Sequence, residues 1–296
     1  MSLLATIRFI ANHPLNREHK LESILRFARW QLESRVASGD VVYDWVNGSR
    51  FFVKSGETGL TGNIYTGLHE FADMGFLLHF LRAEDLFVDI GANVGSYTIL
   101  ACAAIGARGV AFEPVPGTFA RLVANMRLNQ LADAVRCINK GVGAKQGTVS
   151  FTSDRDTTNR ALAPGERCGN EEVVDVTTLD AALHGEGPSL VKIDVEGYEF
   201  PVLEGAQETL KNQTLCAAIV ELNGSSTRYG FDESKILDLM YSYGFKTYSY
   251  DPLSRTLANL EGKSLISDNT LFIRNRSLVE DRLRRAPKIV VQGKQF

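Results

Sequence analysis

The segment that most constrains this chain is an uncharged run of eighteen residues, from Ile90 to Ala107. Its length approaches that of a membrane-spanning helix, and Gly91 and Gly95 have a spacing that also occurs where such helices pack together. Asp89 directly precedes the run, however, and polar side chains such as Asn93 interrupt it. Polar groups are costly in lipid, whereas a strand, a glycine turn and a helix accommodate them. The run therefore predicts a strand–turn–helix unit, with the helix over 96–105, and no membrane span.

Short apolar segments alternate with segments of helical length from Leu86 onward. The apolar segments are rich in β-branched and aromatic residues, which is typical of strands. Strands alternating with helices indicate βαβ crossovers and a mainly parallel sheet covered on both faces. We therefore predict a doubly wound, Rossmann-like α/β fold, with an antiparallel last strand over 269–274 at the end of the sheet. The expected strands are LFVDI, GVAFE, AVRCI, SLVKID, CAAIVEL and FKTYSY, and the expected helices cover 96–105, 117–129, 199–211 and 232–243.

The residues on either side of this core predict smaller elements. Residues 20–36 have helical periodicity, and VVYDWV and RFFVK around Asn47-Gly48-Ser49 predict a hairpin. A helix is expected from Gly67 to about Leu81, with Thr66 as its N-cap. GTVSFTS and VVDVTTLD, within 141–178, predict extra strands joined by a polar loop. The expected domains are an α+β extension over 1–82, a ligand-binding domain over 83–276 and a basic tail over 277–296.

The overall charge argues against a nucleic-acid partner, because the formal net charge is −3. The two ends are nevertheless basic: residues 1–36 carry six Arg or Lys against three Glu, and residues 274–296 carry seven against two acids. Solvated ends and a polyanionic partner both fit this distribution. The four cysteines form no C-x-x-C pair, which predicts reduced thiols, no zinc site and a cytoplasmic protein. Arg8 interrupts the apolar N-terminal segment, so no signal peptide is expected.

The predicted glycine turn lies where parallel sheets bind ligands, beyond the carboxyl end of a strand. Gly91 and Gly95 allow a sharp turn and a close approach of the backbone to a ligand. The helix that follows presents free N–H groups to an anionic group such as a carboxylate. Glu113 ends the next strand, 24 residues after Asp89, where a carboxylate can accept two hydrogen bonds from a ribose diol. An adenosine-type ligand fits this edge of the sheet. The same residues would also be found if the glycine turn bound no ligand and Glu113 were an exposed acid at a strand end.

A third strand end, in VKIDVEGYE over 191–199, places further acids at the same edge. Asp194 ends the strand, and Glu196 would point to the same side if the extended conformation continued. Two acids and Lys192 in an otherwise apolar strand are costly to bury unless they have a role or form an ion pair. We therefore expect these acids at the ligand-binding edge, with an ion pair of Lys192 as the alternative.

These segments together resemble the FkbM-type methyltransferases, within the S-adenosylmethionine-dependent Rossmann class. The resemblance rests on FVDIGANVGSYT, on AFEP, and on LVKIDVEGYEFPVLEGAQETL followed by AAIVELN, and it spans roughly residues 65–250. It implies a class I methyltransferase fold with S-adenosyl-L-methionine as the cofactor. The cofactor-binding residues that it implies are Asp89, Gly91, Asn93 and Gly95 for the methionine part, Glu113 for the ribose hydroxyls, Asn139 near the adenine, and Asp194 at the same rim.

The resemblance also implies methyl transfer, usually to an oxygen of a sugar, a glycan or a small natural product. Alignment of the reacting atoms is worth about 7–11 kcal/mol, and a general base that removes the acceptor's proton adds about 10²–10⁴-fold. The candidate bases are Asp194, Glu196 and His69. The candidate acceptor-binding residues are Tyr65, Glu70, Glu221 and Asn223. His69 also fits as a partly buried helix residue, and Glu221 and Asn223 also fit as caps of the following loop.

The reaction requires no metal. Asp194 and Glu196 could contribute to a divalent site of the catechol-methyltransferase kind, but they have no third partner at a fixed spacing, so no metal is expected and metal dependence stays open. The acceptor pocket is expected between the N-terminal extension and the 152–172 loop, whose Arg155, Arg160 and Arg167 are either solvated or suited to an acidic sugar or phosphate. A nicotinamide oxidoreductase is an alternative that the missing G-x-G-x-x-G disfavours, and a cofactor-binding protein without catalysis is another. The acceptor and the oligomeric state stay open.

Overall fold

The computed structural model describes residues 3–36, 39–54, 60–152, 159–163 and 165–296. Within these ranges, eight strands form a central sheet in the order β12-β11-β13-β10-β9-β3-β4-β5. The strands are β3 (Leu86–Ile90), β4 (Arg108–Phe112), β5 (Val135–Ile138), β9 (Leu190–Ile193), β10 (Ala217–Glu221), β11 (Lys246–Asp251), β12 (Thr256–Asn259) and β13 (Asn269–Ile273). Strands β10, β9, β3, β4 and β5 are parallel, which confirms the mainly parallel sheet. Strand β13 is antiparallel as predicted, but it lies between β10 and β11 rather than at the end.

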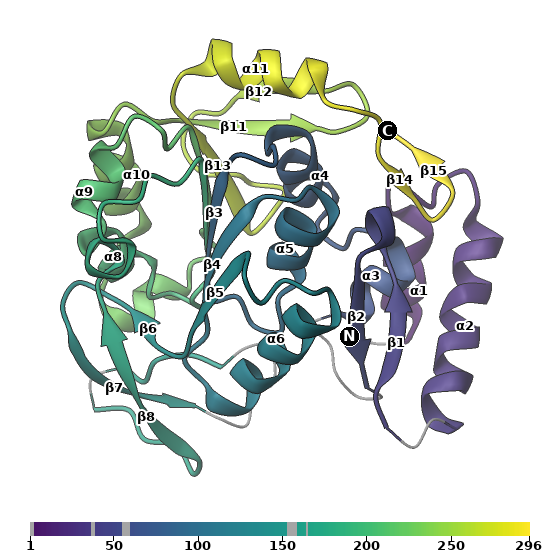
Figure 1. Ribbon diagram of the computed structural model, residues 1–296, viewed down its shortest axis with the longest axis horizontal. Coiled ribbons are helices and arrows are strands. Elements are labelled where there is room, and N and C mark those ends of the chain that lie inside the picture. Colours follow the sequence, from purple (N-terminus) through teal and green to yellow (C-terminus); the bar gives the residue numbers. More distant parts are fainter. Residues whose placement is uncertain (1–2, 37–38, 55–59, 153–158, 164) are drawn as a thin grey trace.

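Helices cover both faces of this sheet (Figure 1). Because side chains alternate along a strand, Phe87 and Ile219 belong to one apolar core and Val88 and Val220 to the other. The first face is covered by α4 (Phe71–Phe80), α5 (Ser96–Ile99), the π-helical turn η2 (Leu100–Ala104) and α6 (Pro116–Leu128), and the second by α7 (Leu179–Leu183), α8 (Glu199–Glu204), α9 (Gln207–Lys211) and α10 (Glu233–Ser242). The fold is therefore the doubly wound, Rossmann-like arrangement that the alternating segments predict. The helix expected over 199–211 is divided, however, because the chain bends at Gly205.

The N-terminal elements form a layer beside the sheet, at the right of Figure 1. They are α1 (Leu3–Asn12), α2 (Lys20–Val36), β1 (Val41–Asp44), the 3₁₀ turn η1 (Val46–Gly48), β2 (Arg50–Val53) and α3 (Thr61–Thr66). The predicted helix over 20–36 and the hairpin are confirmed. The helix predicted from Gly67, with Thr66 as N-cap, is wrong. Thr66 ends α3 because Gly67 has a φ of 84°, a left-handed conformation that terminates helices, and α4 begins only at Phe71.

A small second sheet and a structured C-terminal segment complete the fold. Strands β6 (Gly141–Val142), β8 (Glu171–Thr177) and β7 (Gly147–Thr152) pair in that order, so the two extra strands are confirmed. Arg155, in the predicted polar loop, lies outside the described residues. The expected basic tail folds into α11 (Arg276–Arg285) and the hairpin β14 (Val290–Val291) and β15 (Lys294–Gln295). No helix in the described ranges has the length and apolarity to cross a bilayer.

An ion pair between α11 and Asp85, the residue before β3, predicts a stability effect. Arg282 Nη1 donates to Asp85 Oδ2 at 2.6 Å, and the Asp85 side chain is only 5% exposed. Arg282→Ala should therefore lower the free energy of unfolding by about 3 kcal/mol, because it leaves a buried carboxylate without its cation. Urea denaturation measures this change. Arg284→Ala is the matched control, since Arg284 is 74% exposed and should cost less than about 1 kcal/mol; equal losses would contradict the assignment.

Candidate active site

The carboxyl ends of β3, β4, β9 and β10 open into a cavity of about 330 Å³, a volume within the range of small-molecule sites. Asp89, Glu113 and Asp194, which the sequence placed at one edge, all line it. The other walls come from the N-terminal residues before β3 and from the three-stranded sheet. The charged side chains of the lining are mostly acidic: Glu70, Asp89, Glu113, Asp194, Glu196 and Glu221, against Lys140 and Lys192.

Gly91 brings two strand ends into direct contact. Its φ is 78°, and a Cβ atom at this position would lie 1.8 Å from the carbonyl oxygen of Asp194. A glycine is therefore required both by the conformation and by the space. Gly95 has a different role from the expected ligand contact, because it does not line the cavity. A Cβ there would meet Leu122 at 2.8 Å, so this glycine allows α6 to pack against the turn.

Glu113 organises the turn from the end of β4. Its two carboxylate oxygens accept hydrogen bonds from the backbone N–H groups of Asn93, at 3.0 Å, and Val115, at 2.9 Å. Burial raises the pKa of Glu113 to about 7, although these two hydrogen bonds act in the opposite direction. Each carboxylate oxygen has two lone pairs, so Glu113 keeps the capacity to accept hydrogen bonds from a ligand. Asn93, with a φ of 52°, also lines the cavity.

Asn139 was expected at the cofactor site, but it does not line the cavity. Its Nδ2 donates to the backbone carbonyls of Glu113 and Pro114, both at 2.9 Å. Asn139 therefore fixes the chain leaving β4. The next three residues, 140–142, line the cavity in its place.

Asp89 and Lys192 form the buried floor of the site. Asp89 is 1% exposed, and its Oδ2 accepts a hydrogen bond from Thr98 Oγ1 at 2.6 Å. Lys192 Nζ donates to Asp194 Oδ2 at 2.6 Å and lies 4.7 Å from the centroid of the Tyr97 ring. Burial acts to lower the pKa of Lys192, but the negative charges of Asp194, Glu70 and Asp89 together outweigh burial and raise it. The ion pair that the sequence left as an alternative for Lys192 is therefore present.

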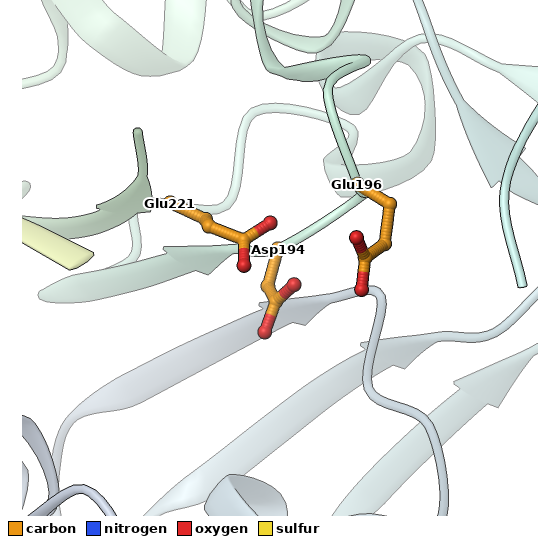
Figure 2. A group of neighbouring side chains, drawn as sticks. All are labelled: Asp194, Glu196 and Glu221. Atoms are coloured by element: carbon orange, nitrogen blue, oxygen red, sulfur yellow. The ribbon is translucent and has the colours of Figure 1, made fainter. Parts of the chain in front are cut away.

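Three carboxylates converge above this floor (Figure 2). Oxygens of Asp194, Glu196 and Glu221 lie within 4.8 Å of one another. Burial, and then the charge of Asp194, raise the pKa of both Glu196 and Glu221. Sequence reasoning found no third partner for Asp194 and Glu196, because Glu221 lies on another strand. A proton or a divalent cation would relieve the repulsion, and carboxylate oxygens are ligands that Mg²⁺ or Mn²⁺ accepts.

Two of the residues expected near the acceptor line the cavity from the segment between α3 and α4. His69 lies in the turn between α3 and α4, not on a helix, and its ring centroid is 5.2 Å from that of Phe9. Glu70 Oε2 accepts a hydrogen bond from Tyr97 Oη at 2.9 Å, and Glu70 Oε1 accepts one from Asn269 Nδ2 at 2.7 Å. Both residues line the cavity, so the N-terminal extension contributes to the site as expected.

Two other predicted acceptor residues do not reach the cavity. The Tyr65 hydroxyl accepts a hydrogen bond from Gln31 Nε2 at 3.1 Å, within the N-terminal layer. Asn223 Oδ1 accepts one from the Ser225 N–H at 2.9 Å and caps the loop after β10. The alternative that the sequence allowed for Asn223, a loop cap, is therefore the observed one. Glu221 lines the cavity instead.

The structure adds residues that sequence reasoning missed. Glu199 is 1% exposed, and its Oε1 accepts a hydrogen bond from the Gly197 N–H at 2.9 Å, which holds the turn that carries Glu196. The signal for Glu199 was an acid in the first turn of a predicted helix. Phe151, Asn159 and Tyr198 also line the cavity, but their spacing in the sequence gives no sign of this.

The arginines of the 152–172 loop do not form an open anion site in the described ranges. Arg160 is buried, and its two terminal nitrogens donate to Glu166 at 2.8 Å and 2.5 Å. Arg167 is exposed, and Arg155 lies outside the described residues. An ion pair therefore accounts for Arg160, so the pattern of arginines does not by itself indicate an acidic acceptor.

Known proteins resemble the chain in the same segments. The sequence profile described as the methyltransferase FkbM domain matches residues 89–247. The hexuronic acid methyltransferase AglP of Haloferax volcanii is 29% identical over 149 residues, which cover 50% of this chain and 59% of AglP. The methyltransferase sdnD of Sordaria araneosa is 28% identical over 162 residues, which cover 43% of this chain and 62% of sdnD.

Among solved structures, the crystal structure of the methyltransferase FkbM from Methylobacillus flagellatus KT is 18% identical, with a TM-score of 0.46, and the match covers 72% of this chain and 52% of that one. The chain spans less than two thirds of the length of AglP and of sdnD. The FkbM profile, in contrast, matches more than half of the chain. The chain therefore belongs to the FkbM methyltransferase family.

Proposed function

We propose that this protein is an S-adenosylmethionine-dependent methyltransferase that methylates an oxygen of a sugar, a glycan or a small natural product. The observation that carries the proposal is the single cavity lined by Gly91, Asp89, Glu113 and Asp194, which come from three neighbouring strand ends. Membership of the FkbM family supports the reaction class. The activity of AglP on hexuronic acid favours a sugar among the possible acceptors.

The lining of the cavity suits this cofactor chemically. Its sulfonium and amino groups are cationic, and six of the eight charged side chains that line the cavity are acids, so their combined field favours a cation. Glu113 has the oxygens to accept hydrogen bonds from the ribose hydroxyls, and the turn containing Gly91 and Asn93 would hold the methionine part. When bound, S-adenosylmethionine supplies a methyl group that the sulfonium charge has already activated.

The residues of the chain would then bind the acceptor and remove its proton. Asp194 is engaged by Lys192, which suits a role in positioning. Glu196 is the better base, because burial raises its pKa and so brings it closer to the operating pH. Glu196 would take the acceptor's hydroxyl proton at a carboxylate oxygen, which makes the acceptor oxygen a stronger nucleophile. Glu70 and His69, which also line the cavity, would orient the acceptor.

Calorimetry and labelled methyl transfer test the proposal. We expect S-adenosylmethionine to bind and NAD⁺ not to bind. With S-adenosylmethionine labelled in the methyl group, we expect incorporation into a panel that includes hexuronic acid glycosides, neutral glycosides and small phenols. Binding of NAD⁺ in place of S-adenosylmethionine would contradict the proposal. A cofactor that binds but is never turned over with any acceptor in the panel would favour the non-catalytic alternative.

The role of Glu113 predicts a loss of cofactor affinity. Glu113→Ala should weaken S-adenosylmethionine binding by about 1.5–3 kcal/mol, because charge-assisted hydrogen bonds to the ribose are lost. Isothermal titration calorimetry measures the change, and circular dichroism verifies that the variant is folded. Asp133→Ala removes an exposed acid of the same domain and should leave the affinity unchanged. An unchanged affinity in folded Glu113→Ala would refute the ribose assignment.

A further inference from the structure

The outer side of α2 carries a narrow apolar stripe. Leu21, Leu25 and Leu32 are 72%, 60% and 66% exposed, and Ala28 between them is also exposed. At about 100° per residue, these four positions fall within about 60° of one another around the helix. Figure 1 shows α2 as the outermost element on its side of the molecule. Nothing in the described part of the chain therefore covers the stripe.

The inner side of α2 is firmly attached, so the helix cannot turn its leucines inward. Trp30 is 5% exposed in the core. Arg26 Nη2 donates to the Tyr65 carbonyl at 3.0 Å, and the Phe27 ring packs edge-on against the Tyr65 ring at 5.0 Å. Gln31 also donates to the Tyr65 hydroxyl. The exposure of the leucines is thus a consequence of the tertiary fold.

The spacing of the stripe identifies the kind of partner. Residues 21, 25, 28 and 32 are separated by four, three and four positions, which is the a/d pattern of a coiled coil. A helix that packs on a globular core, or lies in a membrane surface, has a broader apolar face than this seam. The charges beside the stripe are mixed, because exposed Arg29 and Arg35 lie there as well as Glu22 and Glu33, so they do not select an anionic lipid surface. The partner that fits is another helix.

The charges beside the stripe are complementary to a second copy in one orientation. Glu22 and Arg29 lie on the same flank, both at the e position when Leu25 is at a. In an antiparallel pair, Leu21 meets the partner's Leu32, and Leu25 meets the partner's Ala28. Glu22 then faces the partner's Arg29, and two-fold symmetry repeats this ion pair. A parallel pair would set alanine against alanine and leave both charges without an opposite charge.

We propose that α2 pairs antiparallel with α2 of a second copy of this chain and forms a two-fold symmetric dimer. The ion pair that Arg29 now makes with Glu33, at 2.6 Å, does not prevent this pairing. Its two side chains are 78% and 52% exposed, and such surface pairs exchange at little cost. A seam of four residues is smaller than a standard interface of about 800 Å² per partner. The dimer should therefore dissociate on dilution. The proposal does not depend on the enzymatic function.

Sedimentation equilibrium of the full chain over a wide concentration range tests the dimer. We expect a mass that rises from monomer to dimer, and a monomer at all concentrations for Leu25→Glu, which places a charge in the seam. Leu253→Glu is the matched control, because Leu253 is 58% exposed in the turn between β11 and β12, and this variant should dimerise normally. A monomeric wild type, or a Leu25→Glu variant that still dimerises, overturns the proposal.

A charge exchange tests the antiparallel register. Glu22→Arg and Arg29→Glu each create two like-charged pairs and should raise the dimer dissociation constant about tenfold. The double variant restores both attractive pairs and should return the constant to the wild-type value. A double variant that is no better than the singles overturns the register. A monomeric protein that binds phosphatidylglycerol vesicles through the leucines would instead assign the stripe to a membrane surface. In that case Glu22→Arg should bind the vesicles more tightly and Arg29→Glu more weakly.

Discussion

Replacing Gly91 with alanine should destabilise the protein by about 3 kcal/mol or more and remove S-adenosylmethionine binding. A residue with a side chain in the left-handed conformation of Gly91 costs about 1–2 kcal/mol. The new Cβ would also lie 1.8 Å from the Asp194 carbonyl oxygen. That carbonyl cannot move away cheaply, because the Asp194 N–H donates to the Ile90 carbonyl at 3.0 Å. The substitution must therefore separate two strand ends that both line the cavity.

Urea denaturation and calorimetry with S-adenosylmethionine measure the two effects of Gly91→Ala. Gly117→Ala is the matched control. Gly117 lies in α6, and a Cβ there would meet no atom within 4 Å, so the control should be neutral or stabilise the protein by up to about 1 kcal/mol. Wild-type stability and affinity in Gly91→Ala would show that the approach of β3 and β9 does not shape the cofactor site.

Glu196→Gln should lower turnover by about 10²–10⁴-fold while leaving S-adenosylmethionine affinity nearly unchanged. Glutamine keeps the size of the side chain but cannot accept the acceptor's proton. A base works only when deprotonated, so turnover should fall as the pH falls through the pKa of Glu196. Because burial raises that pKa, the fall should begin above the usual range of a glutamate. The remaining activity of the variant should lack this pH limb.

Initial rates across pH, together with cofactor titrations, test the role of Glu196. Glu204→Gln is the matched control, since Glu204 is an exposed glutamate of α8 and should retain wild-type turnover. A Glu196→Gln variant with wild-type turnover would move the base to Glu221 or His69. A variant that loses cofactor affinity in proportion to its turnover would instead place Glu196 in the cofactor site.

Local sequence patterns predicted most elements of the central domain. Short apolar runs and segments of helical length alternate along the chain, so β3, β4, β9 and β10 and their helices follow from neighbouring residues alone. Two errors have different causes. The order of strands, which places β13 inside the sheet, depends on contacts between distant segments. The end of α3 is local, because Gly67 terminates the helix that the sequence analysis expected to begin there.

The positions of some residues of the candidate site could likewise be predicted from the sequence, and the positions of others could not. Asp89, Glu113 and Asp194 could be placed together in advance, because the carboxyl ends of parallel strands meet at one edge. Asn139 and Tyr65 were misplaced, because each hydrogen bonds to a group far away in the sequence. Asn223 instead makes the local loop cap that the sequence allowed as an alternative.

The sequence by itself determined the fold class, the edge of the sheet that holds the site and the family, since these depend on periodicity and on short motifs. Only the tertiary structure decided that Glu221 joins Asp194 and Glu196 and that the leucines of α2 face outward. The physical reason is that each of these facts depends on the distance between residues far apart in the chain. Strand order and helix packing set those distances.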